Sequence, residues 1–109
     1  PGYKFSSLTA FSGDDPEAAK SILESFVAET RLNAERLQKA VENEDVDEMA
    51  AVSHKMIPLF TLIGAADLVA LLKLLETSHG VPFTGELKEH ALAALVLIED
   101  VITQATAFP

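Results

Sequence analysis

The chain has 109 residues, of which 49% are hydrophobic, and this composition fits one folded domain and excludes a disordered polypeptide. Its 8 basic and 17 acidic residues give a net charge of −9, so neither nucleic acid nor an anionic membrane surface is expected as a partner. There is no cysteine, which excludes disulfides and thiolate metal sites. No apolar run approaches about 18 residues and no signal peptide is recognisable, so no membrane-spanning segment is predicted.

The N-terminal half predicts a short arm followed by a long helix. FSSLTAF (5–11) predicts a short helix or a packed arm. A helix is then expected from about 16 to 42, because Asp15 is a good N-cap and Pro16 suits the first helical position. Apolar residues recur along it every three or four positions and form one stripe. The stripe consists of Ala19, Ile22, Leu23, Phe26, Thr30, Ala34, Leu37 and Val41.

A second helix is predicted to begin directly afterwards. Asp45 is its expected N-cap and Glu48 stands in the position of a capping box. Its core stripe consists of Met49, Val52, Met56, Leu59 or Phe60, and Ile63. Gly64 marks the expected break.

Two further helices complete the chain. Residues 65–80 carry a leucine stripe and end on Gly80, a residue typical of helix C-termini. Thr84 is the expected N-cap of a last helix that runs to about 106. Four amphipathic helices with short connections and no strand pattern predict an all-α fold. We expect an antiparallel four-helix bundle (up-down-up-down) with a short N-terminal helix or arm. Residues 1–109 are expected to form one domain that is a fragment of a larger protein.

His54 occupies an unusual place on the second helix. It lies nearly opposite the core stripe and is therefore expected to face solvent. Its neighbours on that face are small or apolar rather than charged, which predicts a surface that another protein covers. These neighbours, the expected docking surface, are Ala50, Ala51, Ile57, Pro58 and Thr61. Pro58 lacks the N–H that would bond the His54 carbonyl, so a bend is expected there.

An exposed imidazole of this kind suits nucleophilic attack on phosphorus. Neutral imidazole is a good nucleophile near pH 7 and can hold a phosphoryl group on nitrogen. Phosphoryl transfer depends mainly on positioning and charge stabilisation, and a partner can supply both. A carrier needs only the nucleophile, clear access and a docking surface.

Asp45, His54 and Gly64, placed in a bundle of this size, resemble the histidine-containing phosphotransfer (HPt) domain, whose motif is His-x-x-Lys-Gly-x-x-x-x-x-Gly. The likeness covers most of the chain, and the variant is of the kind found in bacterial hybrid two-component sensor kinases. It implies a phosphotransfer intermediate without kinase activity, with His54 as phospho-acceptor through the ring nitrogen farther from the backbone. It also implies a receiver-domain partner that supplies the aspartate and Mg²⁺, no cofactor of the domain's own, a monomer, and a cytoplasmic location, including the cytoplasmic part of a membrane-bound sensor.

Two positions depart from the HPt pattern. Ile57 and Pro58 stand where the family has Lys and Gly, and that Lys is thought to steady the phosphoryl group. Lys55 is the candidate replacement on the same helix, although it lies about 100° round the helix from His54. Lys73 and Lys88 on neighbouring helices are further candidates. The departure motivates an alternative function: a degenerate, non-phosphorylated bundle that binds a partner through the same apolar face.

Other chemistries find less support. Glu76-x-x-His79 matches one half of a di-iron motif, but no second Glu-x-x-His exists, so no metal site is predicted. Ser53 points away from His54 on a helix, so Ser-His-Asp catalysis is not expected. No Gly-rich phosphate loop is present, so kinase activity of the domain's own is not expected either. His79 is expected to cap a helix end and His90 to be solvent-exposed.

Overall fold

The computed structural model describes residues 2–108, which form helices joined by turns and include no strand. In chain order they are α1 (Ser6–Thr9), the 3₁₀ helix η1 (Ala10–Ser12), α2 (Pro16–Glu42), α3 (Val46–Leu62), α4 (Ala66–Glu76) and α5 (Gly85–Ala107). The predicted all-α class is therefore confirmed, and the predicted bounds of the first long helix are matched. Pro1 lies outside the described residues.

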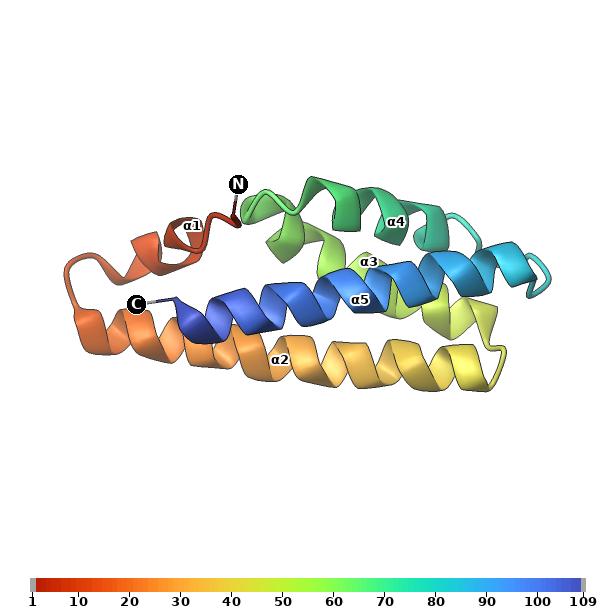
Figure 1. The fold of residues 1–109 in the computed structure, drawn as a ribbon, viewed down its shortest axis with the longest axis horizontal. Helices are drawn as coiled ribbons and strands as arrows, with labels where there is room; N and C mark the ends of the chain where they lie inside the picture. The colour runs from red at the N-terminus through yellow and green to blue at the C-terminus, as the bar shows by residue number, and fades with distance from the viewer. Residues whose placement is uncertain (1, 109) are drawn as a thin grey trace.

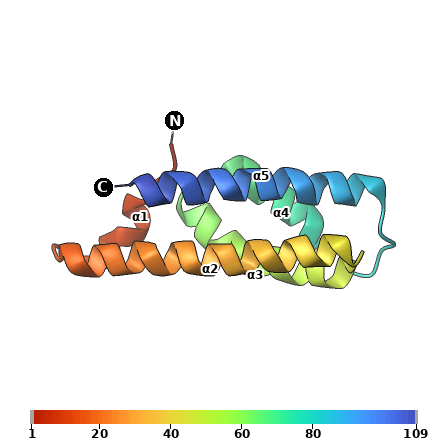
Figure 2. The ribbon, with the colours of Figure 1, turned by 60° about the horizontal axis from the view of Figure 1, so that its bottom comes forward.

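The long helices pack along one another in an elongated molecule of 48 × 23 × 19 Å. The main contacts of α2 are with α3 and α5, and those of α4 are also with α3 and α5. Both views show α2 and α5 side by side along most of their lengths (Figure 1, Figure 2). Helices α1 and η1 pack against α2.

Each predicted N-cap residue caps its helix. The Asp15 carboxylate accepts hydrogen bonds from the backbone N–H groups of Glu17 and Ala18, at 3.0 and 3.3 Å. The Asp45 carboxylate accepts from Glu48 N–H at 3.1 Å, and the Thr84 hydroxyl accepts from Leu87 N–H at 3.1 Å. These side chains satisfy backbone donors that would otherwise lack partners at a helix start.

The Glu48 carboxylate does not complete the capping box at Asp45. It binds the Arg36 guanidinium through two hydrogen bonds of 3.0 and 3.1 Å, so it ties α3 to α2 instead. The hydrogen bond from Arg36 to Glu48 raises the pKa of the guanidinium. A tertiary ion pair with two hydrogen bonds has outcompeted a local contact.

Helix α4 ends at Glu76, before the predicted end at residue 80. The hydroxyls of Thr77 and Ser78 donate to the Leu74 carbonyl at 3.0 and 2.8 Å. Such hydrogen bonds offer the backbone an alternative to continuing the helix. Gly64 and Gly80, in the turns that follow α3 and α4, adopt φ values of 75° and 81°, which favour glycine.

One hydrophobic cluster connects the helices. Phe26 of α2 and Phe60 of α3 meet edge to face with ring centroids 6.1 Å apart. Phe60 is the core member at the position where the sequence left Leu59 or Phe60 open, since Leu59 is 44% exposed. Two polar residues of α2, Thr30 and Asn33, are also buried.

The N-terminal arm contacts both the end of α3 and the C-terminal part of the chain. Lys4 N–H donates to the Ile63 carbonyl at 2.8 Å, and the Phe5 ring packs against Phe108 at 5.6 Å. The Tyr3 hydroxyl donates to the Asp100 carboxylate at 2.9 Å. Burial, with this hydrogen bond and the Asp100 charge, raises the pKa of Tyr3 to about 12.

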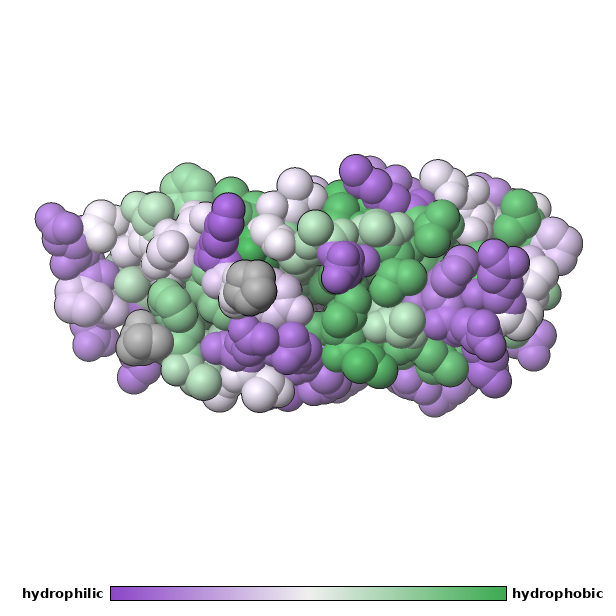
Figure 3. Space-filling model, turned by 45° about the horizontal axis from the view of Figure 1, so that its top comes forward, coloured by the Kyte–Doolittle hydropathy of each residue, from purple (hydrophilic) through white to green (hydrophobic). Residues whose placement is uncertain are grey.

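Helix α5 contains a long apolar window, although the sequence predicted no membrane-spanning segment. By length and composition alone it is sufficient to cross a membrane, with a mean hydropathy of 1.3 in its most apolar window, of which 33% is buried. Apolar side chains gather on the face over α4 and α5 shown in Figure 3, and Leu74 and Val96 are exposed members of those helices. The other side of α5, including Ala91 and Ile98, lies in the core.

Candidate functional site

His54 projects from α3 into solvent, with 77% of its side chain exposed. The adjacent residue Ser53 is fully buried, and Val52 and Met56 belong to the core. The period of the helix places the imidazole on the side away from these residues. The ring is therefore accessible, as its position in the sequence predicts.

Glu76 contacts the imidazole from the last turn of α4. Its carboxylate oxygen Oε2 pairs with His54 Nδ1, and the Glu76 side chain is about one third exposed. In a neutral ring only one nitrogen carries the proton, and a carboxylate beside Nδ1 holds it there. The lone pair of Nε2, the nitrogen farther from the backbone, then remains free.

The sequence pointed to Glu76 only as half of a metal motif with His79. Its contact with His54 depends on how α4 packs against α3, and no local pattern encodes that packing. The sequence did carry one signal for this packing. The turn between the two amphipathic helices is short, so α4 had to lie beside α3.

Most of the predicted docking surface is accessible. Ala51, Pro58 and Thr61 are exposed, and Ile57 is half-buried because it packs on the edge of the core. Ala50 is the exception: only 4% of it is exposed, so its prediction as a docking residue is wrong. It lies on the flank of α3 that faces the neighbouring helices rather than solvent.

The structure adds two apolar side chains to this surface. Leu59 and Leu62 are 44% and 39% exposed, on the far side of Pro58 from Ile57. Pro58 itself does not end α3, which continues to Leu62. Because proline has no N–H, the His54 carbonyl lacks its usual helical hydrogen bond.

The candidate lysines lie in different surroundings. Lys55 Nζ is 3.0 Å from Glu29 Oε1 and is therefore directed toward α2, whereas His54 contacts α4. This placement argues against Lys55 as the phosphate-stabilising residue. Lys73 is exposed on α4, one turn before Glu76. Lys88 is exposed on α5, which packs mainly against α2 and α4.

The other histidines differ from His54. His79 lies in the turn beyond α4, and its Nε2 is 3.7 Å from Asp47 Oδ1. His79 was predicted to cap the end of α4, but its side chain contacts α3 instead. His90 is half-buried, and its Nδ1 is buried without a hydrogen-bond partner, so the predicted exposure is only partial.

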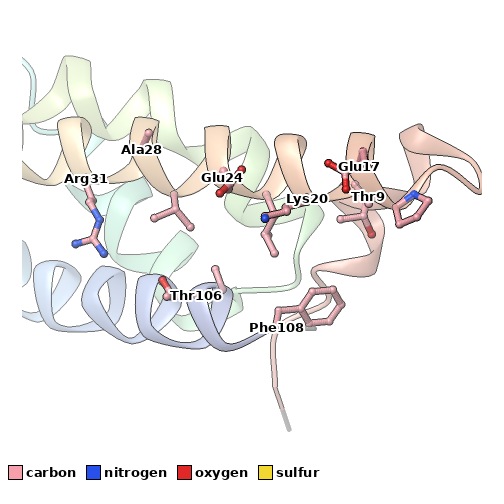
Figure 4. Close-up of a pocket in the computed structure, with 13 residues that line it drawn as sticks. Thr9, Glu17, Lys20, Glu24, Ala28, Arg31, Thr106 and Phe108 are labelled. Carbon is pink, nitrogen blue, oxygen red and sulfur yellow. The ribbon is translucent and has the colours of Figure 1, made fainter.

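A sizeable cavity lies away from His54. It has a volume of about 800 Å³ and is lined mainly by α2, with α5 and Phe108 closing the other side (Figure 4). Lys20, Glu24 and Arg31 reach its rim from α2. None of its lining residues belongs to α3 or α4. Within residues 2–108, no three His, Asp or Glu side chains gather as metal ligands would.

Comparisons with known proteins do not assign the chain to a family. No protein-family profile, no curated protein and no solved structure matches the chain.

Proposed function

We propose that this protein is a phosphorelay carrier of the HPt kind, which accepts a phosphoryl group on His54 from a receiver-domain aspartate and passes it on to another. The observation that carries this proposal is the exposed His54 ring whose Nδ1 is held by Glu76. A histidine that serves only as a surface residue needs neither the carboxylate nor the apolar surroundings.

The transfer step follows from that arrangement. The Nε2 lone pair attacks phosphorus in line with the bond to the aspartyl oxygen. A bond forms between Nε2 and phosphorus, the phosphorus–oxygen bond breaks, and its electron pair leaves with the aspartate as carboxylate. The proton on Nδ1 stays in place, so the phosphorylated ring is cationic and the Glu76 carboxylate stabilises it.

The fold assigned to this carrier is an antiparallel four-helix bundle. Two ion pairs between α2 and α3 support it: Arg36 pairs with Glu48 and, further from the connecting turn on both helices, Glu29 pairs with Lys55. Helices whose contacts move apart from a shared turn in this way run in opposite directions. In this proposal the domain acts as a cytoplasmic monomer, alone or within a membrane-bound sensor.

The receiver is proposed to dock on the face around His54. Ala51, Pro58 and Thr61 are exposed there and carry no charge, so a partner can approach without desolvating ionised groups. The receiver supplies the aspartate and the Mg²⁺ that neutralises the transferred group.

Labelling by phosphorylated receivers tests this proposal. A panel of receiver domains carrying radioactive phosphate on aspartate is mixed with the domain, and transfer is followed by gel autoradiography. We expect labelling by at least one receiver, its loss in His54→Gln, and its retention in His79→Gln, a control at a similarly exposed histidine. Labelling retained by His54→Gln would contradict the assignment.

The alternative, a non-phosphorylated interaction module, is favoured by one observation. Leu59 and Leu62 are exposed next to Pro58, which enlarges the apolar surface beyond what access to His54 requires. This alternative predicts that a receiver binds without transfer, that Pro58→Glu abolishes binding, and that His54→Gln leaves binding unchanged in titration calorimetry. Phosphate transfer to His54 would rule it out.

A further inference from the structure

A phosphoryl group on His54 would stand in an acidic setting. The Glu76 carboxylate already contacts the ring, and the whole chain carries a net charge of −9. A phosphoryl group adds negative charge and strong acceptor oxygens. Glu76 favours the cationic ring but repels the phosphoryl oxygens, so a nearby cation is needed.

Helix α3 does not supply this cation. Ile57, one turn after His54, is apolar and packs on the core. Lys55, the lysine next to His54, is paired with Glu29 of α2 at 3.0 Å. The other helix that contacts the imidazole is α4.

Lys73 is the basic residue of α4 on the flank that carries Glu76. Residues three positions apart on a helix are neighbours on its surface, so Lys73 stands one turn from Glu76. That turn leads toward the connection between α3 and α4 at Gly64, and so does the turn from His54 to Ile57. Since His54 and Glu76 are in contact, this register puts Lys73 at about the level of Ile57 along the two packed helices.

Two further observations suit Lys73 to this role. Its neighbour Leu72 is fully buried, which fixes this turn of α4 against the core. The Lys73 side chain is exposed, and among the ion pairs formed by residues 2–108 it takes part in none. A lysine ammonium on a flexible stem is free to swing toward an anion that appears nearby.

We infer that Lys73 binds the phosphoryl group on His54 and supplies from α4 the positive charge that Ile57 cannot supply from α3. This inference rests on the proposed function, because it assumes that His54 is phosphorylated. The Lys73 ammonium donates hydrogen bonds to phosphoryl oxygens while Glu76 holds Nδ1 on the opposite side of the ring. The acceptor site is thus shared between two helices.

The test compares lysine variants with a small phosphoryl donor, phosphoramidate, so that no docking partner is involved. Phosphohistidine formation is followed by ³¹P NMR in the wild type, Lys73→Ala, Lys73→Arg and Lys55→Ala. We expect Lys73→Ala to slow phosphorylation of His54 about tenfold, Lys73→Arg to stay within about twofold of the wild type, and Lys55→Ala to behave as the wild type. Molar salt should shrink the Lys73→Ala effect, because salt screens an exposed charge.

Thermal melting of each variant separates this role from a structural one, since Lys73 is exposed and its removal should leave the melting temperature unchanged. If His54 of the wild type is phosphorylated and Lys73→Ala is equally fast, the Lys73 role is wrong and the carrier function stands. If wild-type His54 is not phosphorylated by phosphoramidate or by any receiver, both proposals are wrong.

Discussion

At the scale of single residues, His54 and Glu76 act as a pair. The ring is exposed, and the carboxylate from α4 contacts Nδ1 and leaves Nε2 free. The position of His54 follows from helical periodicity and could be predicted from the sequence. Glu76 could not, because its role depends on a tertiary contact between two helices.

Replacing Glu76 tests whether its carboxylate sets the tautomer of His54. In Glu76→Ala the acceptor at Nδ1 is lost, so the proton redistributes between the ring nitrogens and less of the ring has a free Nε2. We expect His54 to be phosphorylated several-fold more slowly, and ¹⁵N NMR of the imidazole to show more Nε2–H. Glu76→Gln retains an acceptor oxygen, so its phosphorylation rate should lie between those of the wild type and Glu76→Ala. An unchanged nitrogen spectrum in Glu76→Ala would show that the carboxylate does not set the tautomer.

At the scale of helices, the sequence predicts starts better than ends. Asp15, Asp45 and Thr84 cap their helices as expected, because a cap depends on a few adjacent residues. The end of α4 was placed too late, since Thr77 and Ser78 turn their hydroxyls back onto the helix. Local hydrogen bonds of this kind compete with helix propensity and are hard to weigh from sequence.

Pro58 weakens α3 while leaving it continuous. Pro58→Ala restores the hydrogen bond from residue 58 to the His54 carbonyl and removes the ring clash. Because an interior proline costs a helix about 3 kcal/mol, partly offset by its stiffening of the unfolded chain, we expect a gain of about 1–3 kcal/mol in the free energy of unfolding. Urea denaturation measures it. A loss of stability would mean that α3 is shaped around the proline.

The N-terminal arm gives stability a pH dependence through Tyr3. Its pKa is about 12 in the folded protein against an ordinary value of 10.0. A raised pKa in the folded state means that the contribution is fully present below pH 10 and is lost as the pH rises toward 12. Tyr3→Phe should therefore flatten the fall of the melting temperature in this window.

Tyr3 is the chain's one tyrosine, so its ionisation can be followed directly by ultraviolet absorbance. The titration should have its midpoint well above pH 10 in the folded protein and near 10 in denaturant. A midpoint near 10 in both would show that the arm does not hold Tyr3 against Asp100.

At the scale of the whole molecule, one apolar core holds α3 and α4 so that His54 and Glu76 meet at the surface. The stripes predicted much of this core, including Phe26, Leu37 and Val52, because burial follows the 3.6-residue period. They misplaced Ala50, at the edge of the stripe, where burial depends on how closely the next helix approaches. The charges around His54 could not be predicted from the sequence, because they depend on the tertiary ion pair between Lys55 and Glu29.

The most direct test of His54 as a phosphoryl acceptor compares it with His79, since their side chains are 77% and 75% exposed. Both are present in one ¹⁵N-labelled protein treated with phosphoramidate, and NMR reports which ring nitrogen gains phosphorus. We predict phosphorus on Nε2 of His54 while His79 remains unmodified. Equal modification of the two rings, or phosphorus on Nδ1 of His54, would show that His54 is an ordinary surface histidine.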